Sequence, residues 1–166
     1  MGYTHYWNYK NPKAEDTAKA TTIVKEMKKM LLHLPERSKT GGGFYIDDRI
    51  VIKNGLGEKI PLINTTEILF NGDASVGFDH ETFAFEFGKQ IDFDFCKTAR
   101  KPYDFFVCAC ILSLANHLEG FEFSSDGGFD DWKPALDFYI EMFGDSVSDN
   151  LTKVFLDNFE KDLVSK

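Results

Sequence analysis

The sequence predicts a single α+β domain with a mainly antiparallel sheet and about four helices. Several short segments alternate apolar and polar residues, as half-buried strands do, and turn residues separate them. Longer segments repeat apolar residues at the spacing of an amphipathic helix. The 166 residues suit one domain with a sizeable core, and no linker or repeat divides residues 1–166.

Residues 3–8 are the first predicted strand, because they alternate and are rich in Tyr, Thr and Trp. The alternation places Tyr3, His5 and Trp7 on one face. A glycine triplet at 41–43 indicates a flexible loop. The other predicted strands cover residues 44–46, 50–53, 60–63, 67–70, 81–87 and 121–124.

The four predicted helices cover residues 15–34, 102–117, 130–143 and 147–164. Apolar residues of the first helix recur at helical spacing, and its charged residues, Glu26 among them, are expected to face outward. Pro35 ends that helix. Pro102 suits the first position of the second helix, where a missing N–H has no cost.

Charge and composition exclude some classes of function. The net charge of −8 disfavours binding to duplex DNA or to an anionic membrane, and no apolar run is long enough to span a bilayer. We expect a cytoplasmic protein. Cys96, Cys108 and Cys110 form no C-x-x-C pair, so neither a disulfide framework nor a zinc site is predicted. The 17 Phe residues either fill the core, as is usual for Phe, or in part line a ligand pocket or a homo-oligomer interface.

A basic block precedes the second predicted helix. Lys97, Arg100 and Lys101 lie where the free N–H groups and partial positive charge of a helix start would also attract an anion. The pattern predicts a phosphate or carboxylate site. The alternative is that the three cations are solvated or paired with acidic residues.

Two further segments carry polar groups suited to a site. His5 lies between large aromatic residues and is either a catalytic acid or base or a hydrogen-bonded core residue. Tyr6 and Trp7 would stack on a planar base or belong to the core. Ser125 and Asp126 end a predicted strand and form either one wall of a site or an ordinary turn.

Motifs for common cofactors are missing from the sequence. There is no Walker loop, G-x-G-x-x-G, H-E-x-x-H or G-x-S-x-G. Asp79 and Glu81 could share a metal ion, whereas His80 would point to the opposite face. The sequence predicts no cofactor and no metal site.

The ordered motifs Gly2–Trp7, Phe70–Gly72, Phe95–Asp104 and Ser124–Gly127 extend along nearly the whole chain. In this order they resemble a family of small, mostly uncharacterised phage and bacterial proteins that share GYTHYW and FCKTARKPYD motifs. The resemblance implies that these segments occur as a set, as parts of one site would, and that a phage origin is plausible. It implies no particular reaction.

The leading hypothesis is the sequestration of a small anionic ligand, such as a nucleotide or a nucleotide-derived messenger. In a phage, such a protein would counteract immune signalling in the host cytoplasm. A binding protein of this kind needs only enclosure and satisfied hydrogen bonds. The predicted ligand-binding residues are Tyr3, Tyr6, Trp7, Asn71, Lys97, Arg100, Lys101, Tyr103, Asp104, Ser125 and Asp126.

Two other hypotheses stay open. The first is a nucleotide phosphoesterase or related hydrolase, with His5 as acid or base, Asp126 or Asp104 orienting it, and Lys97 and Arg100 as a clamp on the transition state. The second is a module that binds a host protein through the acidic surface.

Overall fold

The computed structural model describes residues 2–36 and 49–164 and confirms the predicted α+β class. Within these ranges the helices are α1 (Asp16–Leu32), α2 (Asp104–His117), α3 (Phe129–Phe143) and α4 (Asp149–Val164). The strands are β1 (Thr4–Tyr9), β2 (Leu62–Ile63), β3 (Glu67–Phe70), β4 (Phe83–Glu86), β5 (Ile91–Lys97) and β6 (Phe121–Ser125). Two short 3₁₀ turns cover Ala74–Val76 and Gly144–Ser146.

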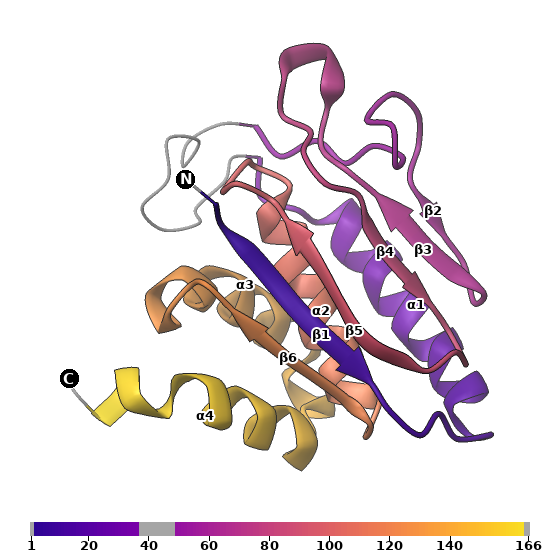
Figure 1. Cartoon of the computed structure of the whole chain (residues 1–166), viewed down its shortest axis with the longest axis vertical. Coiled ribbons are helices and arrows are strands. Elements are labelled where there is room, and N and C mark those ends of the chain that lie inside the picture. Colours follow the sequence, from indigo (N-terminus) through magenta and orange to yellow (C-terminus); the bar gives the residue numbers. More distant parts are fainter. Residues whose placement is uncertain (1, 37–48, 165–166) are drawn as a thin grey trace.

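The strands form two antiparallel sheets, with the orders β5-β1-β6 and β2-β3-β4. In Figure 1 both sheets lie in front of α1, α2 and α3, while α4 lies along the β6 side. Helix α2 packs against α1, α3 and α4, and nearly all of its residues are buried. The most apolar helix is therefore the centre of the helical layer, as expected for a helix that is hydrophobic on all sides.

Strand β1 is the middle strand of its sheet, so its two faces have different surroundings. His5, Trp7 and Tyr9 point into the core, and each is at most 2% exposed. Tyr6 and Asn8 alternate with them and are half-buried on the other face. This confirms the predicted strand and its division into faces.

Some local predictions are wrong. Residues 50–53 form no strand and contribute one bridge, between Lys53 and Asn71. Residues 91–97, which we did not predict as a strand, form β5. Their pattern is unusual because the large side chains Phe93 and Phe95 face outward. The predictions at 41–43 and 44–46 lie outside the described residues.

The start of α2 also differs from the prediction. The helix begins at Asp104, and Pro102 lies in the preceding turn. Ala99 and Arg100 both have positive φ, of 53° and 59°, so the chain turns sharply between β5 and α2. This turn brings Asp104 under the sheet. No helix within the described ranges is long and apolar enough to cross a bilayer.

Candidate functional site

His5 is the centre of a buried polar cluster beneath β1. Its side chain is 0% exposed and accepts or donates hydrogen bonds at both ring nitrogens. Nε2 lies 2.6 Å from Asp104 Oδ1, and Nδ1 lies 2.8 Å from Ser125 Oγ. The ring therefore links the first residue of α2 to the last residue of β6.

Asp104 is a carboxylate that is held in the interior by several donors. It is 1% exposed, and Oδ1 also accepts a 2.5 Å hydrogen bond from the Thr98 hydroxyl. It lies in the first turn of α2, where the helix dipole favours a negative charge. These interactions offset the cost of burying a charged group.

Ser125 joins the cluster through strand pairing. His5 and Ser125 are directly opposite each other on β1 and β6, so their side chains share a face. Unlike His5, Ser125 is partly exposed. The hydrogen-bonded series Ser125–His5–Asp104, which we call the relay, thus runs from the surface to the core.

Hydrogen-bond accounting sets the direction of the relay for the state that catalysis by a base requires, with Asp104 ionised and the His5 ring neutral. An ionised Asp104 only accepts, so the proton of the 2.6 Å bond belongs to His5 Nε2. The neutral ring then has a bare Nδ1, which requires the Ser125 hydroxyl to donate. The Gly127 N–H donates to Ser125 Oγ at 2.9 Å, which leaves the hydroxyl proton for His5. His5 is therefore placed as a base towards Ser125.

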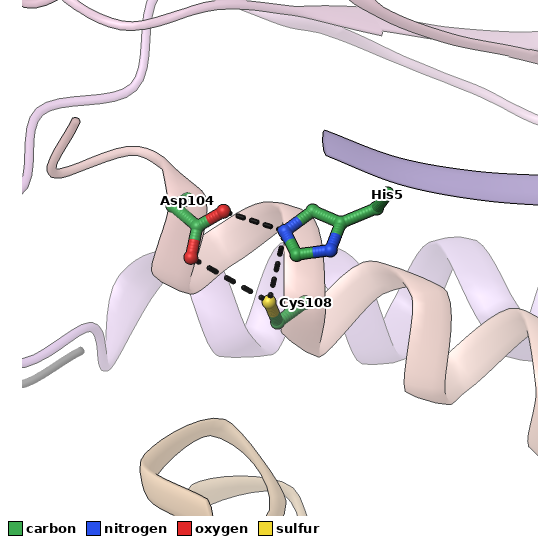
Figure 2. Close-up of side chains that lie close together, drawn as sticks. All are labelled: His5, Asp104 and Cys108. Carbon is green, nitrogen blue, oxygen red and sulfur yellow. Dashed lines mark hydrogen bonds and ion pairs between the residues drawn. The ribbon is translucent and has the colours of Figure 1, made fainter. Parts of the chain in front are cut away.

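Cys108 completes the buried cluster one helical turn after Asp104. Figure 2 shows its Sγ near both His5 and Asp104, at 3.6 Å from Nε2 and 3.7 Å from Oδ2. Histidine, aspartate and cysteine are also zinc ligands. However, two ligands of a tetrahedral zinc ion lie about 3.3 Å apart, so the 2.6 Å between Nε2 and Oδ1 is that of a hydrogen bond.

The cysteines should be unreactive in the folded protein. Burial raises the pKa of Cys108, and the negative charge of Asp104 raises it further. Burial also raises the pKa of Cys96 and Cys110, so all three remain thiols. We expect no reaction with Ellman's reagent in native buffer and modification of three thiols in denaturant. Rapid labelling of the native protein would contradict the burial of the three thiols.

Tyr3 lies beside the relay with an unused donor. Its hydroxyl is buried and finds no hydrogen-bond partner among the described residues. Burial raises the pKa of Tyr3, so the hydroxyl stays protonated. Gly127 passes close to it, since a Cβ there would lie 2.2 Å from the Tyr3 hydroxyl oxygen. A donor is thus available beside the backbone that contacts Ser125.

The basic block is largely occupied by internal contacts. The Arg100 guanidinium lies 4.0 Å from the centre of the Tyr3 ring and 2.7 Å from Asp131 Oδ1. Lys101 Nζ donates to the carbonyls of Gly77 and Asp79, at 2.9 and 2.7 Å. Lys97 is half-buried at the end of β5. An anion would have to displace these partners of Arg100 and Lys101.

Asp126 does not orient His5, so Asp104 is the carboxylate of the pair. Asp126 is exposed directly after the end of β6, where it accepts hydrogen bonds from the Thr4 N–H and the Tyr6 hydroxyl. The bond to Tyr6 places the Asp126 carboxylate on the side of the sheet opposite to the face that Ser125 and His5 share.

The remaining predicted ligand-binding residues have structural contacts. Trp7 is 2% exposed and packs on Phe83, and Tyr103 is 0% exposed and donates to the Glu81 carbonyl. The Asn71 amide bonds the backbone at four positions, which ties together two loops. Buried rings cannot serve as stacking platforms, so of the predicted rings only Tyr6 keeps an accessible edge.

The structure thus brings three predicted segments together: the first strand, the turn before α2 and the Ser-Asp-Gly corner. The sequence did not reveal Thr98 as a partner of Asp104 or Cys108 as a neighbour of His5. The apolar run around Cys108 predicts an ordinary core residue. Only its spacing of four from Asp104 in a helix indicates that the two side chains are neighbours. Comparison with known proteins finds no matching family model, no similar curated protein and no similar solved structure.

Proposed function

We propose that this protein is a hydrolase that cleaves an ester by acyl transfer, with Ser125 as the nucleophile, His5 as the general base and Asp104 as the residue that orients His5. The observation that carries the proposal is the relay itself. Nucleophile, base and orienting carboxylate are within hydrogen-bond distance, and the partly exposed group is the nucleophile.

The reaction balances without any further reagent except water. The Ser125 proton moves to His5 Nδ1 as Oγ bonds the carbonyl carbon. The same proton then leaves with the alcohol oxygen, and an acyl-serine remains. Water, deprotonated by His5, hydrolyses that ester and restores the hydroxyl.

Negative charge on the carbonyl oxygen needs nearby donors. The candidates are the Tyr3 hydroxyl, which is buried without a partner among the described residues, and the Gly127 N–H, which donates to Ser125 Oγ and would have to turn to the carbonyl oxygen. The neighbouring carboxylate Asp126 and the net charge of −8 favour a neutral ester over an anionic phosphoester, while the charge of Asp131 is balanced by Arg100.

Labelling with a fluorophosphonate probe, followed by peptide mass spectrometry, tests the proposal. We expect an adduct on Ser125 in the wild-type protein and none in Ser125→Ala. Ser124→Ala is the matched control, because this exposed neighbour points to the other face of β6 and should label normally. Tyr3→Phe should slow p-nitrophenyl acetate hydrolysis by about 10²-fold. An unlabelled wild-type protein, or equal labelling of Ser125→Ala, would refute the assignment.

Sequestration of a small nucleotide-like ligand is our second proposal. The convergence of the three predicted segments supports it. The internal partners of Arg100 and Lys101 argue against the anion site that the sequence predicts at the basic block. Mass spectrometry of small molecules released from the heated protein tests it, because a sequestered ligand would return chemically unchanged.

A further inference from the structure

The sheet β5-β1-β6 has an open face with exposed aromatic side chains. Figure 1 shows this sheet in front of α2, with its other side uncovered by helices in that view. Tyr6 and Phe95 are paired in the register of β1 and β5, and Phe93 follows on the same face. Phe93 is 65% exposed and Phe95 is 46% exposed. We call these three residues the aromatic face.

The rings of the aromatic face form a continuous row. Tyr6 and Phe93 are stacked, with centroids 6.1 Å apart and an angle of 26° between planes, and Phe93 and Phe95 are 5.9 Å apart. A hollow of about 190 Å³ adjoins the row and is lined by Tyr6, Phe93 and residues of β1 and β6. The hollow is smaller than a typical drug-sized site, and it suits one planar ring system.

Hydrogen-bond acceptors border this hollow. Asn8 and Glu122 both line it; Glu122 is exposed, whereas Asn8 Oδ1 is itself buried and has no donor among the described residues. The Glu122 carboxylate only accepts hydrogen bonds, whereas the exposed Ser124 hydroxyl can donate or accept one. The polar border therefore complements a planar ligand with N–H donors along one edge.

We propose that the aromatic face binds the base of a guanine nucleoside. Guanine is planar and carries N–H donors at N1 and N2 along one edge, which match the two oxygens of the exposed Glu122 carboxylate, whereas adenine has an acceptor at N1. Stacking on exposed aromatic rings supplies the affinity. A nucleic-acid polymer is disfavoured by the net charge of −8.

The size of the patch argues against a second protein chain as the occupant. An aromatic side chain offers only about 150–250 Å², and these three rings are only partly exposed. A stable protein interface needs about 800 Å² from each partner. The inference is independent of the proposed hydrolysis, because Ser125 and His5 lie on the opposite face of the sheet.

Calorimetric titration of the full chain with guanosine and with adenosine tests the proposal. We expect saturable binding that favours guanosine. Phe93→Ala should weaken guanosine binding about tenfold, and Glu122→Gln should reduce the preference over adenosine. Leu156→Ala, an exposed apolar residue on α4, is the matched control and should bind as the wild type does.

Three results would overturn the proposal. The first is the absence of saturable binding up to the solubility limit of guanosine. The second is unchanged binding by Phe93→Ala. The third is a concentration-dependent dimer that Phe93→Ala dissociates, measured by sedimentation, because the face would then be covered by a second copy of the chain.

Discussion

Replacing Asp104 with Ala should lower the free energy of unfolding by about 3–5 kcal/mol. The carboxylate is 1% exposed and accepts hydrogen bonds from the His5 ring and the Thr98 hydroxyl. Its removal leaves both donors buried without an acceptor, and water cannot easily reach them. Urea denaturation followed by circular dichroism measures the change.

Two variants separate the charge from the space that Asp104 fills. Asp104→Asn keeps the volume and one acceptor oxygen, so we expect its free energy of unfolding to lie between those of the wild type and Asp104→Ala. Asp92→Ala removes an exposed carboxylate from β5 and should leave the unfolding midpoint unchanged. If Asp104→Ala were as stable as Asp92→Ala, the buried cluster would contribute nothing to the fold.

The fold could be predicted from the sequence wherever one side of an element is buried. The alternation of residues 3–8 and the helical spacing of residues 15–34 each correspond to an element with one apolar face, β1 and α1. Strand β5 was missed because Phe93 and Phe95 are exposed on it, so its apolar residues do not mark the core. An alternating pattern predicts a strand only where the apolar residues face the core.

The site was only partly predictable, because its contacts are remote in sequence. His5 was selected for its aromatic neighbours, but 99 residues separate it from Asp104 and 120 from Ser125. Choosing Asp104 over Asp126 required the register of β1 and β6. The Asp131 partner of Arg100 likewise lies 31 residues away, on α3. The sequence does not show this pairing, so it predicts a basic block that can bind an anion.

Glu26 shows the same limit at a second buried cluster. It was predicted to face outward among the lysines of α1, yet it is 6% exposed and points to α2 and α3. The Ser113 hydroxyl donates to Oε1 at 2.8 Å, the Tyr139 hydroxyl at 2.5 Å, and His117 Nε2 lies 2.9 Å from Oε2. A carboxylate with three partners is stable in the core, which composition alone cannot reveal.

Glu26→Ala should therefore destabilise the protein by about 3–5 kcal/mol, or about 10 °C in the melting temperature. The substitution removes the acceptor of two buried hydroxyls and the partner of His117, and with them the polar contacts that link α1 to α2 and α3. Scanning calorimetry measures the effect. Lys28→Ala, on an exposed position of the same helix, is the control and should melt with the wild type.

A double-mutant cycle shows whether the loss comes from the hydrogen bonds or from the lost volume. Ser113→Ala alone should cost about 1 kcal/mol, because it removes one donor from Glu26. In the Glu26→Ala background the same change should cost less, since the hydroxyl there has already lost its acceptor. Additive losses would mean that the two side chains are uncoupled, and the role assigned to Glu26 as a link between helices would then be wrong.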